Sequence, residues 1–168
     1  PRWLLQEPVI ESLKILAAHN LPFDVVGVLP QHIETVLDIA NKIPSLQMVF
    51  DHLNQPPVAT QEKFGRWGEL MAEAAVRPNL YAKISGLGTA VKKDNWSADD
   101  IRPYVAYMLE HFGADRCFCG SDWPVSLLAG SYVNTWAIYQ ELIRSLLSKE
   151  ESGKVLAGNA RAFYNLSV

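Results

Sequence analysis

Short apolar runs alternate with longer stretches of helical periodicity along the whole chain. Four runs rich in β-branched, apolar and aromatic residues, each bounded by Pro, Asn, Asp or Gly, predict strands. They lie at 23–28, 46–51, 80–85 and 117–121. Elsewhere apolar residues recur every three or four positions, which predicts helices. The helical ranges are 8–20, 31–42, 64–76, 98–111, 132–148 and 149–164.

The order of these elements predicts an α/β fold with a parallel sheet. Strands that alternate with helices join through right-handed crossovers, and strands recur here about every 25 to 35 residues, the length of a βαβ unit. Four such units make half of a (β/α)8 barrel, which typically has about 250 residues. A complete small doubly wound sheet is the alternative on length alone. We expect residues 1–168 to form a single domain.

A nucleotide-binding version of the doubly wound sheet has little support. Such a sheet carries a glycine-rich phosphate loop between a strand and the helix that follows it. Gly86 and Gly88 follow a predicted strand, but a third glycine is missing and no helix is predicted to start there.

Composition narrows the class of protein and its partners. Of the 168 residues, 49% are hydrophobic and 20% are charged, which is typical of a folded globular protein. The net charge of −3 offers no attraction for nucleic acid or an anionic membrane. No apolar run approaches the roughly 20 residues of a membrane span. Neither nucleic acid nor a membrane is therefore an expected partner.

The cysteines and the chain start bear on the expected location. Cys117 and Cys119 lie two apart on one predicted strand, a spacing that suits neither a disulfide nor a zinc site. We interpret them as buried apolar residues in a reducing compartment, so a cytoplasmic location is expected. No signal peptide is visible, and the chain begins at Pro1 without Met, as if cut from a longer protein.

The candidate chemistry begins in residues 120–125, which read Gly-Ser-Asp-Trp-Pro-Val. Pro124 cannot continue a central strand because it has no backbone N–H, so Asp122 lies at or just past the carboxyl end of a strand. In α/β folds, ligands bind and catalytic groups project at that end. A buried carboxylate there usually has a cation, a metal or a reactant beside it.

A second strand end carries a histidine. His52 follows the run at 46–51, and it could converge with Asp122 over one barrel mouth because both emerge at carboxyl ends. The structural alternative is a polar residue that only caps its strand. By strand alternation, Asp51 should point to the side opposite His52.

Lys83 is unusual because it interrupts an apolar run that should be buried. It either points into the sheet interior, where it needs a carboxylate partner, or extends its ammonium group to solvent. Ser85 shares its face and lies nearer the strand end. Contact with a substrate and a structural ion pair are both open roles here.

Three motifs together resemble the amidohydrolase-related TIM-barrel hydrolases. They are residues 50–57 (Phe-Asp-His-Leu-Asn-Gln-Pro-Pro), 83–86 (Lys-Ile-Ser-Gly) and 120–125. They recur in this order in that family, and the most similar branch is that of the sugar-lactone hydrolases, such as the fuconolactone and rhamnonolactone hydrolases. Tyr104 and the stretch at 158–164 add to a resemblance that spans essentially the whole chain.

The resemblance implies the C-terminal half of a (β/α)8 TIM barrel, with the N-terminal strands missing from this chain. Asp122 matches the last-strand acid, which acts as general base on water or as a metal ligand. His52 matches the mid-barrel histidine, which binds metal or polarises the substrate carbonyl. In a hydrolase that opens such a ring, Trp123 would form a pocket wall, with a core or interface aromatic as the alternative, and Lys83 and Ser85 are the candidate substrate contacts, with a structural ion pair as the alternative.

The cofactor implied by the resemblance is a divalent metal such as zinc, with His52 and Asp122 as its ligands in this chain. The family carries a His-x-His pair on its first strand, and this sequence contains no such pair. A metal-independent mechanism is the alternative, as in some lactonases of the wider group.

The leading hypothesis is an enzyme that opens a sugar lactone or similar cyclic ester, a small-molecule substrate, and that is inactive as this fragment alone. One alternative is a non-catalytic half-barrel that forms a homo-oligomer or pairs with its missing half, because two sheet edges are open. The other is a decarboxylase or hydratase of the same superfamily.

Overall fold

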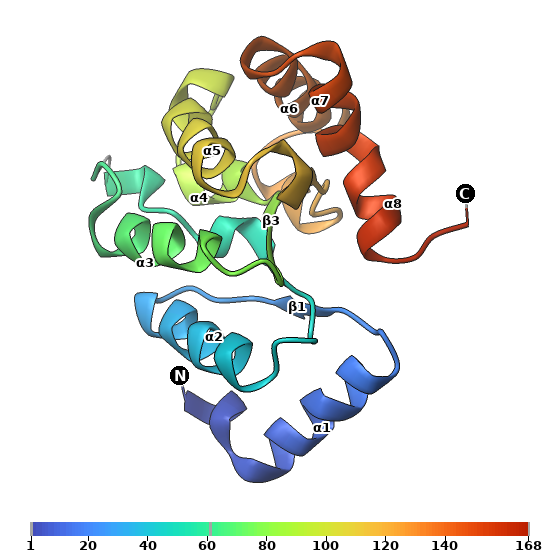
Figure 1. The fold of residues 1–168 in the computed structure, drawn as a ribbon. Coiled ribbons are helices and arrows are strands. Elements are labelled where there is room, and N and C mark those ends of the chain that lie inside the picture. Colours follow the sequence, from blue (N-terminus) through green and yellow to red (C-terminus); the bar gives the residue numbers. More distant parts are fainter. Residues whose placement is uncertain (1, 61, 168) are drawn as a thin grey trace.

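The sheet of the protein contains four parallel strands that follow one another in chain order. The computed structural model describes residues 2–60 and 62–167. The strands are β1 (Phe23–Val25), β2 (Met48–Phe50), β3 (Leu80–Ile84) and β4 (Cys117–Cys119). Every pairing in the order β1-β2-β3-β4 is parallel, which confirms the predicted arrangement. In Figure 1 the colours accordingly run in sequence order across the molecule.

Helices connect the strands close to the predicted places. They are α1 (Glu7–Ala18), α2 (Pro30–Lys42), α3 (Gly65–Ala75), α4 (Leu87–Val91), α5 (Ala98–Phe112), α6 (Tyr132–Leu146), α7 (Lys149–Gly153) and α8 (Asn159–Phe163). A π-helical turn, η6 (Lys154–Gly158), joins α7 to α8. None of the helices described is long and apolar enough to cross a membrane.

One helix corrects the sequence interpretation. No helix was expected directly after Gly86, but α4 begins at Leu87. Gly86 has a φ of +61°, a left-handed conformation that glycine adopts readily, and it turns the chain from β3 straight into the helix. α4 has only five residues, too few for its apolar periodicity to be recognised.

Side-chain alternation gives the sheet two different faces. Met48 of β2 aligns with Leu80 of β3, and both pack into the main core beneath the helices. The next residues along, Val49 and Tyr81, align on the opposite face and belong to a separate small apolar cluster. The helices that connect the strands therefore cover one face, as the βαβ pattern predicts.

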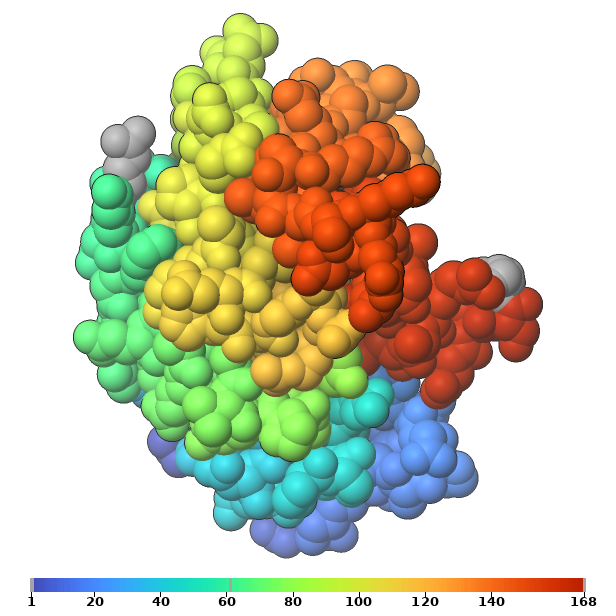
Figure 2. Space-filling model, turned by 45° about the horizontal axis from the view of Figure 1, so that its top comes forward, coloured from blue at the N-terminus to red at the C-terminus, as the bar shows by residue number. Residues whose placement is uncertain are grey.

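The end of the chain covers part of the opposite face. Phe163 of α8 packs on Val49 and on Phe118, with ring centroids 5.2 Å apart in the second contact. Tyr164 Oη donates a hydrogen bond of 2.7 Å to Asp24 Oδ2 in β1. Figures 1 and 2 show the red C-terminal segment beside the blue N-terminal part of the molecule. The C-terminal residues thus tie the β4 side of the sheet to β1.

Both cysteines are free thiols buried in β4, which confirms their interpretation as apolar packing residues. Burial raises the pKa of both thiols, that of Cys119 to about 12. They are therefore protonated at neutral pH and serve as small apolar side chains rather than as nucleophiles.

Candidate active site

A cavity of about 360 Å³ opens toward the carboxyl ends of β2, β3 and β4. Strand ends, the segment after β4 and α8 all contribute to its walls. The residues lining it include Asp51, His52, Lys83, Ser85, Asp122 and Tyr164. Three neighbouring strands therefore bring four of the five predicted site residues into one cavity.

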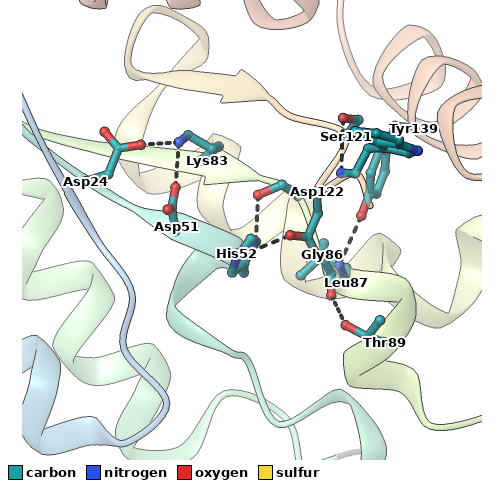
Figure 3. A network of polar contacts seen from close by, with 12 residues as sticks. Asp24, Asp51, His52, Lys83, Gly86, Leu87, Thr89, Ser121, Asp122 and Tyr139 are labelled. Atoms are coloured by element: carbon teal, nitrogen blue, oxygen red, sulfur yellow. Dashed lines mark hydrogen bonds and ion pairs between the residues drawn. The ribbon is translucent and has the colours of Figure 1, made fainter. Parts of the chain in front are cut away.

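His52 and Asp122 face each other in this cavity (Figure 3). His52 Nε2 lies 3.7 Å from Asp122 Oδ1, and the two side chains are 19% and 15% exposed. Both residues have a φ of 55°, in the left-handed region. This conformation costs free energy for residues other than glycine and clusters at functional sites, where the surrounding structure enforces it. The convergence predicted for these two groups is therefore confirmed.

Ser85 and Gly86 form the other side of the slot that holds the histidine ring. Ser85 Oγ lies 2.9 Å from His52 Nδ1, and Ser85 is only 1% exposed. A Cβ atom on Gly86 would lie 2.6 Å from His52 Nδ1 and 2.9 Å from Asp122 Oδ2. The ring and the carboxylate can approach this closely only because residue 86 has no side chain.

Lys83 lines the cavity, and its ammonium group is held between two carboxylates (Figure 3). Its Nζ lies 2.5 Å from Asp24 Oδ2 and 2.6 Å from Asp51 Oδ1. Burial lowers the pKa of Lys83, but hydrogen bonds with Asp24, Asp51 and Tyr164 raise it by more, so its pKa lies above the ordinary value. The expectation that an inward Lys83 needs a carboxylate partner is confirmed.

The orientation expected for Asp51 is wrong. Strand alternation placed it on the side opposite His52, but both side chains line the cavity. β2 ends at Phe50, and the residues from His52 to Gln55 all have positive φ, which breaks the alternation. His52 and Asn54 are of types that adopt positive φ more often than most, but Leu53 and Gln55 are not, so the residue types do not predict four consecutive left-handed residues.

Three residues that shape the site were not predicted from the sequence. Asp24 stands as a single charge in an apolar run, and this signal could have paired it with Lys83. Tyr164 belongs to a stretch noted only for its resemblance. Tyr139 of α6 accepts a hydrogen bond of 3.0 Å from the Leu87 N–H and so fixes the turn after β3; burial raises the pKa of its phenol. That long-range contact has no signal in the sequence.

Trp123 does not line the cavity. Its residue is 64% exposed, and its backbone N–H lies 3.3 Å from Ser121 Oγ at the turn after β4. Its role as a pocket wall stays a prediction.

The donor atoms of the chain do not by themselves complete a metal site. His52 Nε2 and Asp122 Oδ1 are atom types that zinc accepts, but a catalytic zinc typically has three protein ligands. The described residues contain no group of three or more His, Cys, Asp or Glu that could hold a metal ion. Two donors alone are too few to form a complete catalytic metal site.

Comparison with known proteins places this geometry in a family. The family model described as amidohydrolase matches residues 2–166. The chain is 34% identical over 166 residues to an L-fucono-1,5-lactonase of Burkholderia ambifaria, covering 96% of this chain and 56% of that protein. It is 26% identical to an L-rhamnono-gamma-lactonase of Scheffersomyces stipitis, covering 94% and 53%. The chain thus spans about half the length of the curated relatives it matches.

A solved structure shows the same architecture. A crystal structure of an amidohydrolase from Burkholderia multivorans with bound zinc superimposes with a TM-score of 0.90 at 27% identity, covering 98% of this chain and 59% of that one. The four strand–helix units correspond to half of an amidohydrolase TIM barrel, as expected from the motifs. On the family match and this superposition, the chain belongs to the amidohydrolase family.

Proposed function

We propose that this chain supplies the general base and a carbonyl-polarising group of a hydrolase that opens a sugar lactone or a similar cyclic ester. The observation that carries the proposal is the convergence of His52 and Asp122 in one cavity, with Nε2 and Oδ1 3.7 Å apart. The relatives named as lactonases support the substrate class.

In the proposed reaction, the Asp122 carboxylate takes a proton from a water molecule, whose oxygen attacks the lactone carbonyl carbon. Negative charge then develops on the carbonyl oxygen, and the His52 Nε2–H donates a hydrogen bond to it. When the tetrahedral intermediate collapses, the ring C–O bond breaks and Asp122 returns its proton to the alkoxide. The product is a hydroxy acid.

The charge of the cavity favours a neutral ring over a substrate that already carries a carboxylate. Among the described residues that line it, Asp51 and Asp122 are acidic and Lys83 is the basic group. Lys83 is already engaged by Asp24 and Asp51, so it offers an anion little unbalanced positive charge. This balance disfavours the alternative of a decarboxylase, whose substrate is an anion.

A bound metal would give His52 a different role in the reaction, because a nitrogen that binds a metal carries no hydrogen to donate. The Burkholderia multivorans structure contains zinc, and His52 and Asp122 would offer two ligands toward such an ion. The remaining ligands would have to come from outside the described residues. A divalent metal would supply a Lewis acid and a water of lowered pKa.

The test is a panel of aldonolactones, including L-fucono-1,5-lactone, with a pH indicator that reports the acid released. The panel is run on the 168-residue chain, alone and mixed with the part of the Burkholderia ambifaria relative that this chain does not match. Asp122→Asn should lower turnover about 10²- to 10⁴-fold, because the base is lost while the shape of the site is kept.

Asp94→Asn, at an exposed position, is the matched control and should keep full turnover. The same loss in both variants, or full turnover in Asp122→Asn, would remove Asp122 from the mechanism. Hydrolysis of no lactone under either condition would overturn the proposed function.

A further inference from the structure

His52 sits in a slot whose shape does not decide which way its ring faces. Ser85 Oγ lies at one edge, 2.9 Å from Nδ1, and Asp122 Oδ1 lies near the other, 3.7 Å from Nε2. A ring turned by 180° about its axis would fill nearly the same space. It would present carbon atoms to both oxygens, and the Nε2–H would no longer face Asp122.

The hydrogen-bonding capacity of the neighbours decides between these orientations. An ionised Asp122 only accepts hydrogen bonds, so the nitrogen that faces it favourably is one that carries a hydrogen. In a neutral imidazole, the other nitrogen is then an acceptor. A serine hydroxyl can donate to such an acceptor, and at 1% exposure little water is available to replace it.

We propose that Ser85 is a positioning residue whose hydroxyl donates to Nδ1 of His52 and so holds the ring with its Nε2–H facing Asp122 and the cavity. Ser85 acts through His52 and needs no contact with the substrate. The contact between Ser85 and the substrate that was expected from the sequence stays a prediction beside this role. The consequence for turnover rests on the proposed function, whereas the hydrogen bond itself does not.

Two other histidines of the chain can serve as references for a measurement of the protonation of His52 Nδ1. His32 Nδ1 accepts hydrogen bonds from the backbone N–H groups of Val28 and Leu29, at 3.0 and 3.1 Å. His111 Nδ1 lies 2.8 Å from the Tyr107 carbonyl oxygen, a contact that requires an Nδ1–H. The His32 signals are therefore the reference for an Nδ1 that accepts a hydrogen bond, and the His111 signals are the reference for an Nδ1 that donates one.

The experiment records ring ¹⁵N signals of histidine-labelled 168-residue chain at about pH 8, where an ordinary imidazole is neutral. The His52 signals are assigned by their loss in His52→Gln. In the unmodified chain, we expect the His52 pattern to match that of His32, with Nδ1 shifted upfield of a free acceptor nitrogen. A His52 pattern that matches His111 would overturn the proposal, because the histidine would then be the donor.

Ser85→Ala removes the hydroxyl, so His52 Nδ1 should move to the position of a free acceptor while the signals of His32 and His111 stay in place. Ser85→Cys keeps a weak donor and should give an intermediate shift. Ser126→Ala is the matched control. Ser126 is also buried, at 3% exposed, and its Oγ has no hydrogen-bond partner among the described residues.

Unchanged His52 nitrogens in Ser85→Ala, with a melt like that of Ser126→Ala, would also overturn the proposal. Where lactone turnover is measurable, Ser85→Ala should lower kcat on the order of 10- to 100-fold, in the range seen when a partner that orients a functional histidine is lost. KM should change far less. Absent turnover together with the expected ¹⁵N shifts would reject the proposed function and leave the positioning role intact.

Discussion

Gly86 shows at the scale of single residues how closely the site is fitted to its backbone. Gly86→Ala combines an unfavourable φ of +61° with a Cβ atom 2.6 Å from His52 Nδ1. We expect a loss of at least about 1–2 kcal/mol in the free energy of unfolding, measured by urea denaturation. Displacement of His52 from Asp122 should abolish any lactone turnover.

The control for this change is Gly153→Ala. Gly153 ends α7 with helical dihedral angles, and a Cβ atom there would meet no other atom within 4 Å. This substitution should therefore raise the free energy of unfolding by about 0.5–1 kcal/mol. Equal effects of the two substitutions would show that the slot beside Gly86 has room that the structure does not show.

Tyr164 makes the stability of the chain sensitive to alkaline pH. Burial raises the pKa of its phenol to about 12, against about 10 in an unfolded chain. Between these values the unfolded chain has already released the proton that the folded chain still holds. The Tyr164 phenol therefore makes its full contribution to the free energy of unfolding below about pH 10, and that free energy falls as pH rises toward 12.

Tyr164→Phe has no phenol proton to release, so its urea-unfolding free energy should fall less steeply above about pH 10 than that of the unmodified chain. Tyr132→Phe, at an exposed position, is the control. Parallel curves for Tyr164→Phe and the unmodified chain would contradict the assignment.

The residues that could be predicted are those whose type conflicts with their surroundings. Asp122 before Trp-Pro, His52 at a strand end and Lys83 in an apolar run each stand out locally, and all three line the cavity. The contact between Ser85 and His52 joins residues 33 positions apart. It depends on the left-handed backbone that begins at His52 and on that at Gly86. His and Asp adopt positive φ more often than most residues, but the surrounding packing decides where they do so, and residue type alone does not predict the position.

At the scale of elements, one side chain makes two hydrogen bonds at the junction between α8 and β4. Asn159 Nδ2 lies 2.6 Å from the Ala114 carbonyl oxygen and 2.8 Å from that of Cys117, at the start of β4. These hydrogen bonds give a physical reason for an asparagine at this place. They hold the helix that carries Phe163 and Tyr164 onto the sheet.

Asn159→Ala should lower the free energy of unfolding by about 1–2 kcal/mol, because two carbonyl groups lose their donor although alanine favours the helix. Urea denaturation measures this loss. Asn134→Ala, at an exposed position in the first turn of α6, is the control and should not lower stability. If Asn159→Ala were as stable as the unmodified chain, the two hydrogen bonds would not hold α8.

Strand and helix order was predictable because hydrophobic periodicity persists over each long element. The boundaries moved by a few residues where a predicted run ends in polar residues: the run at 46–51 yields β2 only from Met48 to Phe50. α4 was missed because five residues give no period. The π-helical turn between α7 and α8 was missed because its residues also fit a continuous α-helix.

At the scale of the whole molecule, β1 and β4 are the outer strands of the sheet. Among the described residues, β1 pairs only with β2, and β4 pairs only with β3. Unpaired edges are templates for association. Exposed apolar side chains lie near the carboxyl ends of both outer strands, including Val26 and Val28 after β1, and Val125 and Leu127 after β4.

We expect the 168-residue chain to self-associate through these edges at micromolar concentration and above, as measured by light scattering after size-exclusion chromatography. A lysine in place of Val26 should weaken this association, because an edge charge opposes strand pairing. Leu166→Lys, at an exposed position away from the strands, is the control. A cooperative melt of a monomer at every concentration would contradict the expectation.

The ion cluster of Asp24, Asp51 and Lys83 also bears on the release of product after the proposed reaction. Opening a neutral lactone leaves a carboxylate in a cavity whose described lining residues include two carboxylates, Asp51 and Asp122, and one lysine, Lys83, which is already engaged. Hydrolysis would thus convert a neutral ligand into an anion that the carboxylates of the cavity repel. Repulsion between the product and these carboxylates would then speed product release. Release would slow in high salt, where that repulsion is screened.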